Sequence, residues 1–473
     1  MFAASIGLGV DESYVVVAGR NIRLGYFDHP PAVWWLSWLA VHVAGSEAPI
    51  VVRLPFILLF ALSTWLMYRL GAALFSPRAG LCAAIVFNLS PLFGLVFGTF
   101  VLPDGPLDAA LLAAALFLAF ALESCRNKAL ARWSLAGLAV GLALFSKYSA
   151  ILALAGAFLY LVTSPRHRHW LTRSEPWLAV LIAFLVFLPI LIWNASHGWA
   201  SFAYQGNRAL GIAIHPLAPF IVFAGEALFV LPWIWLPLVI SACGSLRRGP
   251  NEWRGWFLLC LAAPAILTFS IIALWSQNRV LFHWAAPGYL MLFPLLGAAI
   301  ETRLAADAPA VRLWLIGTAC FVIIATALVS LEVRRDWPVL LAIRFAVGHD
   351  PTLQLRDWSQ LSAELARRKL LDRPGLVIGT VRWSDAAKIA YALGPDPTVI
   401  VLGSEPHEFG LQHPLARYRG RDVLILAPNV GPRRIVASFG SFFTRIDTLP
   451  PLTLLEGSHP LLIIPLYLGQ ALR

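Results

Sequence analysis

Ionisable side chains cluster in a short segment near the start of the chain. Asp11 and Glu12 are adjacent, and residues 25–31, GYFDHPP, add Asp28 and His29. Charged residues make up only 13% of the chain and apolar residues 59%, so this cluster needs an explanation. Carboxylates and imidazoles can transfer protons or bind a polar substrate. The alternative is a solvated loop in which Asp11 merely caps a helix over 13–20.

Other polar candidates are scattered through apolar sequence. One aspartate lies between two prolines in PDGP, 103–106, and a lysine ends GLALFSK, 141–147. Glu226 lies inside an apolar run, where an ionisable group is costly and usually faces a cavity. A neutral, locally hydrogen-bonded acid is the alternative there. The candidates beyond residue 29 are Arg53, Asp104, Lys147, Arg208, Glu226 and His283.

The composition is that of a polytopic membrane protein. The 473 residues include 19 Trp and 29 Phe, and the mean hydropathy is +0.74. The net charge of +11 does not indicate nucleic-acid binding, because the basic residues lie between apolar runs rather than in one stripe. The five cysteines form no metal-binding set. Ten runs are predicted to cross the bilayer: 55–75, 80–99, 106–122, 133–145, 149–162, 177–194, 216–243, 256–275, 284–300 and 312–331.

The run over 133–162 decides the predicted topology. Basic residues flank both of its ends, at 126–132 and at 166–173, and basic flanks favour the cytoplasmic side. We therefore predict two short helices with a turn at Lys147 on the outer side; one long tilted helix is the alternative. The loops at 11–54, 101–105, 196–215 and 276–283 then also lie outside. The candidate residues of four loops would thus converge on one face of the membrane.

The ends of the chain differ from the middle. Residues 1–10 are apolar but about half a span long, and we expect the outer end of a helix that begins before this chain. Residues 32–45 suit a helix in the membrane interface. We expect a transmembrane domain over 1–331 and a small soluble extracytoplasmic α/β domain over 332–473, with strands at 376–378, 399–402, 423–426 and 461–466 and a helix at 384–393. Gly375 and Gly379 make no dinucleotide-binding loop.

One segment resembles the first extracytoplasmic loop of bacterial GT-C glycosyltransferases of families 39 and 83; its sequence is DESYVVVAGRNIRLGYFDHPPAVWWL. These families include relatives of protein O-mannosyltransferase and aminoarabinose transferase. The resemblance continues, in the expected order over most of residues 11–300, through RLP at 53–55, LPDGPL at 102–107, GLALFSK at 141–147, WN at 193–194 with GW at 198–199, and HW at 283–284.

The resemblance implies a GT-C-like enzyme of the bacterial inner membrane that transfers a sugar, with inversion, from a polyprenyl-monophosphate donor to an extracytoplasmic lipid, glycan or protein. It implies that the catalytic carboxylate is Asp11, and we predict that Glu12 and Asp104 line the same cavity. Relatives carry a phosphate-binding lysine at the position of His29, and an imidazole is only partly charged at neutral pH. This raises the importance of Arg53, Lys147 and Arg208 for the donor phosphate.

Further expectations concern the remaining candidates and cofactors. Asp28, Glu226 and His283 are expected to contribute to substrate binding. No cofactor is certain, although a divalent metal ion could stabilise the leaving phosphate. The expected partners are the donor, the acceptor and membrane lipids, without nucleic acid. The alternatives are a secondary transporter, which would predict repeated halves, and a catalytically inactive relative.

Overall fold

The computed structural model describes residues 2–211, 213–276, 280–335, 355–372, 375–428, 430–456 and 459–473. The chain divides into two compact units. One, the helical bundle, comprises Leu24–Val33 and Arg53–Ala327. The other, the α/β unit, comprises Met1–Arg23, Trp34–Val52 and Leu328–Arg473. The predicted fold class, a helical membrane protein with a small C-terminal α/β domain, is confirmed.

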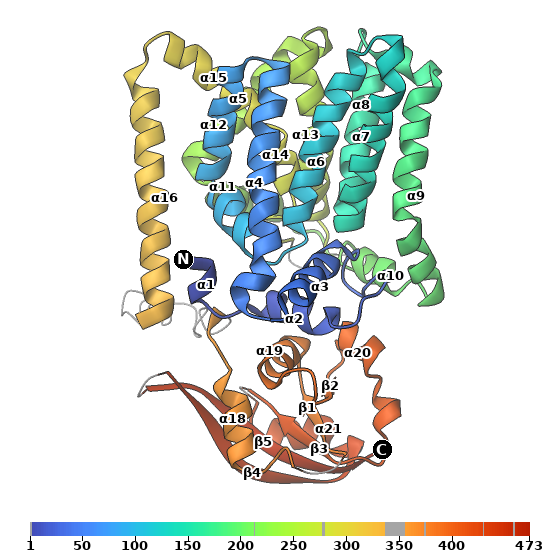
Figure 1. Ribbon diagram of the computed structural model, residues 1–473, viewed down its shortest axis with the longest axis vertical. Helices are drawn as coiled ribbons and strands as arrows, with labels where there is room; N and C mark the ends of the chain where they lie inside the picture. The colour runs from blue at the N-terminus through green and yellow to red at the C-terminus, as the bar shows by residue number, and fades with distance from the viewer. Residues whose placement is uncertain are drawn as a thin grey trace. The chain divides into compact units, whose positions relative to one another are not determined.

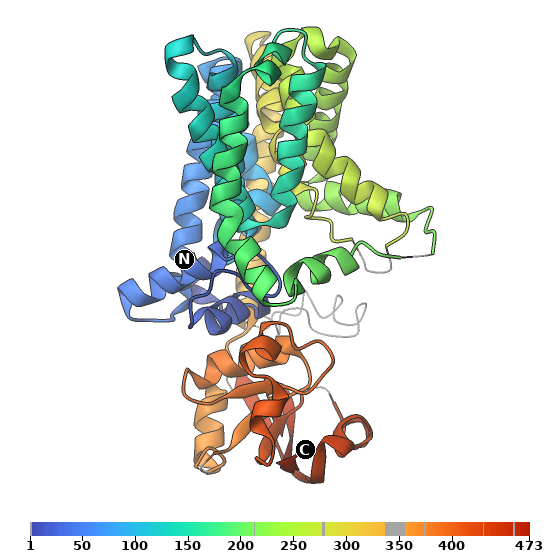
Figure 2. The ribbon, with the colours of Figure 1, turned by 90° about the vertical axis from the view of Figure 1, so that its right-hand side faces the viewer.

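The bundle is built from long apolar helices. Figure 1 shows α4, α6, α7, α8 and α9 running roughly parallel, and Figure 2 shows α7, α8 and α9 side by side. Small residues allow close packing: a Cβ on Gly137 of α7 would collide with the Ala179 carbonyl of α9. The helices are α4 (Pro49–Leu74), α5 (Pro77–Leu89), α6 (Asp104–Leu122), α7 (Arg126–Ser146), α8 (Ile151–Thr163), α9 (Ser174–Ser196), α10 (Ala200–Asn207), α11 (Ala218–Val230), α12 (Pro232–Arg248), α13 (Trp253–Ile272), α14 (Ala286–Leu290), α15 (Phe293–Ala305) and α16 (Pro309–Arg335).

The helical hairpin over 133–162 is confirmed. Lys147 has an extended backbone, with φ −154° and ψ 136°, between α7 and a short 3-10 turn that leads into α8. Beyond the far ends of these two helices, Arg166 donates to Glu123 at 2.8 Å. Those ends therefore lie together, and the single tilted helix is excluded.

Three other predicted spans are interrupted. Among the described residues, six helices are long and apolar enough to cross a membrane, or seven if α11 and α12 form one broken span, against the ten predicted. The 216–243 run bends by 114° between α11 and α12. The 80–99 run divides at Ser90-Pro91 into α5 and a π-helix over Leu92–Phe97, and the 284–300 run divides into α14 and α15. Proline explains the breaks at 91 and 232, because it lacks an N–H and disfavours helical backbone in the residue before it.

The α/β unit contains one five-stranded sheet in the order β2-β1-β3-β5-β4. β1 pairs in parallel with both β2 and β3, whereas β5 pairs antiparallel with β3 and β4. All four predicted strands and the predicted helix are present. The elements are α18 (Gln360–Arg367), β1 (Val377–Thr380), α19 (Trp383–Leu393), β2 (Val399–Val401), α20 (Glu408–Gln412), β3 (Val423–Leu426), α21 (Pro432–Phe439), β4 (Phe443–Glu456) and β5 (His459–Leu472).

The N-terminal segments pack with the C-terminal domain. They form α1 (Phe2–Ser5), α2 (Val10–Gly19) and α3 (Ala32–Ala44). The buried Lys388 ammonium of α19 donates to the Leu8 carbonyl at 2.7 Å. The predicted boundary at residue 332 is therefore too simple, since residues 1–23 and 34–52 belong to the α/β unit. Leu8 is fully buried, and the expectation that residues 1–10 end a longer helix stays a prediction.

Candidate active site

A buried ion pair joins two of the predicted residues. Asp104 opens α6, and Lys147 occupies the extended turn between α7 and α8. The lysine Nζ lies 2.8 Å from Asp104 Oδ1, and the two side chains are only 9% and 3% exposed. A buried charge requires such compensation, because desolvation of a lone ammonium or carboxylate costs several kcal/mol. The pair fixes both groups at the same end of the bundle.

The loop that carries Asp28 and His29 is held against the same end of the bundle. A Cβ on Gly25 would lie 2.7 Å from the Trp193 ring, so glycine permits this close approach. Further along the loop, the Gln205 side chain donates to the Asp28 carbonyl. The local sequence therefore positions His29 through backbone contacts with α9 and α10.

His29, Lys147 and Arg208 line one cavity of about 150 Å³, which we call the polar cavity. The Arg208 guanidinium lies over the Trp284 ring, 4.4 Å from its centroid. Such a cation–π contact orients the charge while leaving its hydrogen-bond donors available. The other residues that line the polar cavity are Tyr148, Ser149, Gln205, Ala209, Phe269, Ile272 and Trp284.

The two histidines near the polar cavity are neutral at pH 7. Desolvation lowers the pKa of His29 to about 4, and the positive charge of Lys147 acts in the same direction. Desolvation and Lys147 likewise lower the pKa of His283 to about 4. Within the described part of the chain, the buried His29 Nδ1 has no hydrogen-bond partner. His29 therefore offers hydrogen bonding to a ligand, while Lys147 and Arg208 supply the positive charge.

Asp108 is a buried acid that the sequence analysis missed. It lies one helical turn after Asp104, is 3% exposed, and its Oδ1 has no hydrogen-bond partner among the described residues. The i, i+4 spacing of the two aspartates places them on one face of α6. That spacing was the signal in the sequence that could have revealed Asp108.

Six of the predicted residues lie around one end of the bundle. Two of them are His29 and His283, and the charges of the other four are close enough to shift the pKa of one or both histidines. Arg53 and Glu226 make contacts with other residues. The Arg53 guanidinium lies 5.4 Å from the Phe100 ring centroid, and Glu226 accepts from Tyr289 at 2.6 Å. The six gathered residues are Asp28, His29, Asp104, Lys147, Arg208 and His283.

Asp11 and Glu12 belong to the α/β unit, in the first turn of α2. The alternative that Asp11 caps a helix over 13–20 is wrong, because α2 begins earlier with Gly9 at its N-cap. The capping acid is the buried Glu12, which accepts from the Gly9 N–H at 2.8 Å. Asp11 is exposed.

No group of three or more His, Cys, Asp or Glu side chains is placed to hold a metal ion in the ranges that the structure describes. The divalent metal therefore stays a prediction, with no ligand set assigned to it.

The known proteins that this chain resembles in sequence are named as glycosyltransferases. The family of dolichyl-phosphate-mannose-protein mannosyltransferases matches residues 28–193. The lipid A galacturonosyltransferase RgtD of Rhizobium johnstonii is 25% identical over 285 residues, 59% of this chain and 58% of the relative. The lipopolysaccharide core galacturonosyltransferase RgtA of the same organism is 24% identical over 61% of this chain and 58% of its own length. The chain spans less than two thirds of the length of these relatives.

The solved structures agree over nearly the whole chain. ArnT from Cupriavidus metallidurans in the apo state superposes with a TM-score of 0.66 at 14% identity, covering 98% of this chain and 95% of that one. ArnT bound to undecaprenyl phosphate gives a TM-score of 0.65 at 15% identity, with the same coverage. The chain has the GT-C fold. The predicted resemblance to GT-C glycosyltransferases is thereby confirmed, and the secondary transporter is not favoured.

Proposed function

We propose that this protein is an integral membrane glycosyltransferase that transfers a sugar, with inversion, from a polyprenyl-monophosphate donor to an extracytoplasmic acceptor. The observation that carries the proposal is the polar cavity, where Lys147 and Arg208 supply two cations at one end of an apolar bundle. A lipid monophosphate leaves as an anion, and fixed cations in a site of low dielectric stabilise such a charge strongly. The fold is shared with ArnT, and one ArnT crystal structure contains undecaprenyl phosphate, which supports a donor of the same class.

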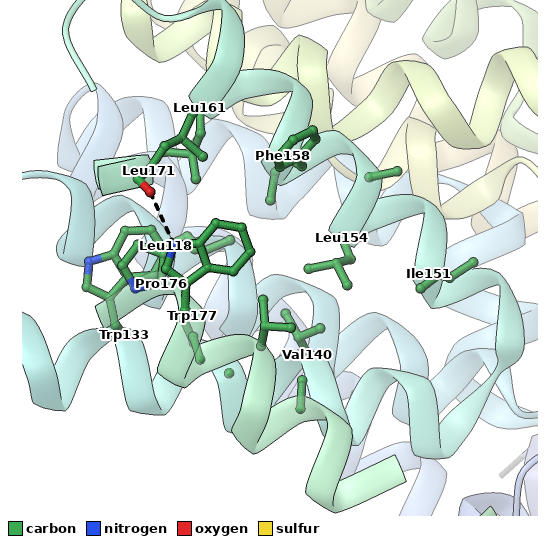
Figure 3. A pocket seen from close by; sticks show the side chains of 17 residues that line it. Leu118, Trp133, Val140, Ile151, Leu154, Phe158, Leu161, Leu171, Pro176 and Trp177 are labelled. Carbon is green, nitrogen blue, oxygen red and sulfur yellow. Dashed lines mark hydrogen bonds between the residues drawn. The ribbon is translucent and has the colours of Figure 1, made fainter. Parts of the chain in front are cut away.

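An apolar groove beside the polar cavity suits the prenyl chain. It has a volume of about 380 Å³ and is lined only by apolar side chains of α6, α7, α8, α9 and the preceding turn. Figure 3 shows Ile151, Leu154 and Phe158 of α8 along this groove. A smaller cavity has Ser149 in common with the polar cavity, and Leu118 and Val140 in common with the groove. We propose that the phosphate binds in the polar cavity and that the prenyl chain lies in the groove.

We assign the catalytic carboxylate to Asp11, with Asp104 and Glu12 in supporting roles. An inverting transfer needs a base that takes the acceptor proton as its oxygen or nitrogen attacks the anomeric carbon. The resemblance to GT-C glycosyltransferases places this base at Asp11, in the first turn of α2. Arg53, Asp28, Glu226 and His283 remain proposed substrate-binding residues.

The side of the membrane, the sugar and the acceptor are also proposals. We infer that the polar cavity faces the periplasmic side of the inner membrane, because the basic clusters flanking 133–162 lie at the opposite end of the hairpin from Lys147. The galacturonosyltransferase relatives favour a uronic acid as the sugar and a lipid A-type glycolipid as the acceptor.

The donor site is tested by binding of undecaprenyl phosphate to the purified protein, measured by native mass spectrometry. Lys147→Met alone would leave Asp104 buried and uncompensated, which costs about 3–5 kcal/mol of stability. The informative variant is therefore Lys147→Met combined with Asp104→Asn, which removes both charges. We expect it to remain folded and to bind the lipid at least about tenfold more weakly.

Lys128→Met is the matched control, because Lys128 is exposed at the other end of α7. Undiminished binding by the double variant would remove the polar cavity from the donor site. Turnover is tested separately, by offering membranes a panel of polyprenyl-phosphate hexoses, pentoses and uronic acids and identifying the product by mass spectrometry. Absence of any glycosylated product across the panel would refute the proposed glycosyltransferase activity.

A further inference from the structure

The sheet of the α/β unit has a topological switch point. β1 lies between β2 and β3 and is parallel to both. The chain leaves β1 through α19 to reach β2 on one side, then returns to β3 on the other side. In open α/β sheets, the connections diverge at the carboxyl ends of such strands and leave a crevice that binds ligands.

A cavity of about 430 Å³ lies at this point, and we call it the carboxyl-edge cavity. Its walls come from the segments that follow β1, β2 and β3 and from α21. Topology and the observed cavity thus identify the same place independently. The volume falls within the range of about 300–1,000 Å³ that is usual for small-molecule sites. The polar side chains in its lining are Arg382, Ser384, Ser404, Glu405, Arg434 and Ser438.

The loops that form this cavity are closely fitted. A Cβ on Gly403, after β2, would collide with the Val381 carbonyl, after β1. Only glycine permits this approach without moving one of the loops. Arg382 is held in place by Asp385, which accepts from its Nε at 2.9 Å and from its Nη2 at 3.1 Å. The cavity is therefore a preformed part of the fold.

The lining chemistry identifies the class of ligand. The Arg434 guanidinium provides planar donors that match a carboxylate or phosphate, and Arg382, whose Nε and Nη2 donate to Asp385, adds a second guanidinium to the lining. Three serine hydroxyls and Glu405 can exchange hydrogen bonds with the hydroxyls of a sugar ring. A dinucleotide is not favoured, because no glycine-rich loop connects β1 to α19. We propose that the carboxyl-edge cavity binds a carbohydrate residue that bears a carboxylate or a phosphate group.

Direct binding to the full-length protein in detergent tests this site without requiring turnover. Isothermal titration uses four probes: galacturonic acid, galactose 6-phosphate, neutral galactose and inorganic phosphate. We expect at least one of the two anionic sugars to bind at least about tenfold more tightly than galactose, because hydrogen bonds between a guanidinium and an anion are stronger than those between neutral groups. If galacturonic acid binds more tightly, the ligand carries a carboxylate; if galactose 6-phosphate binds more tightly, the ligand carries a phosphate.

Arg434→Gln should weaken binding of that sugar about tenfold, whereas Arg433→Gln should not. Arg433 is the matched control, since it is the exposed neighbour on α21 and does not line the cavity. Arg434 is also exposed, so both variants should fold. Equal binding by the two variants, equal binding of galactose, or inorganic phosphate binding as tightly as the sugars would each overturn the proposal. Undecaprenyl phosphate binding should be unchanged in Arg434→Gln, which separates this site from the donor site.

Discussion

The Lys147–Asp104 pair sets the charge of the polar cavity in the absence of a ligand. Each group neutralises the other at 2.8 Å, and Arg208 adds a second cation that Trp284 positions. An incoming phosphate can then share Lys147 with Asp104 instead of meeting an isolated buried ammonium. At the residue scale, the ion pair allows the Lys147 ammonium to be buried without the desolvation cost of an isolated charge.

Asp11→Asn tests the catalytic assignment. We expect the fold and undecaprenyl phosphate binding to be retained while turnover falls about 10²–10⁴-fold, which is the usual contribution of a general base. Asp307→Asn is the control, because Asp307 is also an exposed acid but lies in the loop before α16. The measurement is product formation by purified protein. Near-native turnover of Asp11→Asn would reject the assignment and move the search to Asp28 and Asp104.

His29 should make the protein sensitive to acid. Its pKa is lowered to about 4 from an ordinary value of 6.5, so folding favours the neutral ring. This contribution to stability is complete above pH 6.5 and is lost as the pH falls toward 4. The loss between pH 7 and pH 4.5 amounts to about 2 kcal/mol.

His29→Gln should therefore show a smaller decrease in Tm between pH 7 and pH 4.5 than the parent protein, measured by thermal unfolding in detergent. His42→Gln, which replaces an exposed histidine of α3, should keep the parent's pH dependence. If all three proteins lose the same stability on acidification, His29 does not carry the effect.

At the scale of elements, helix spacing depends on a few glycines. α7 contacts α9 through Gly137, and a Cβ on Gly141 would lie 2.7 Å from the Val186 Cβ. These residues allow the two helix backbones to approach closely, as small residues commonly do in membrane bundles. The apolar groove lies beside this contact, so its shape depends on the same packing.

Gly137→Ala should force α7 away from α9. Overpacking of this kind costs about 1–3 kcal/mol, although alanine is the better helix former. Thermal unfolding in detergent measures the expected destabilisation. Gly206→Ala is the control, because a Cβ at Gly206 of α10 meets nothing within 4 Å. Equal Tm values for the two variants would show that the α7–α9 contact can relax without cost.

At the scale of the whole molecule, the proposal to test is the side of the membrane on which the proposed active site lies. The polar cavity and the α/β unit are both assigned to the periplasmic side. Single cysteines in a cysteine-free background test this in intact cells with a membrane-impermeant thiol reagent. We expect labelling at Asn207→Cys in α10 and Ser404→Cys after β2, and labelling at Asn127→Cys in α7 only after permeabilisation. The reverse pattern would place the polar cavity in the cytoplasm.

The sequence by itself determined the membrane class, the hairpin at Lys147 and four strands of the C-terminal sheet. These features depend on local signals: apolar runs, basic flanks, and short apolar segments between turns. β4 escaped prediction because Pro450-Pro451 interrupts it and its first half, with polar residues such as Thr444 and Asp447, does not alternate between apolar and polar residues. The interrupted spans escaped because hydropathy continues through a proline that nevertheless bends the helix.

Only the tertiary structure decided which candidates meet. His29, Lys147 and Arg208 are separated by more than a hundred and fifty residues in total, yet they line one cavity. Their convergence, and the burial that keeps His29 neutral, depend on how helices pack rather than on local sequence. The grouping of residues 1–23 with the C-terminal domain was likewise decided by packing, through contacts such as that of Lys388 with Leu8. Desolvation and long-range contacts are properties of the folded chain, because they depend on which distant segments exclude water from a given side chain.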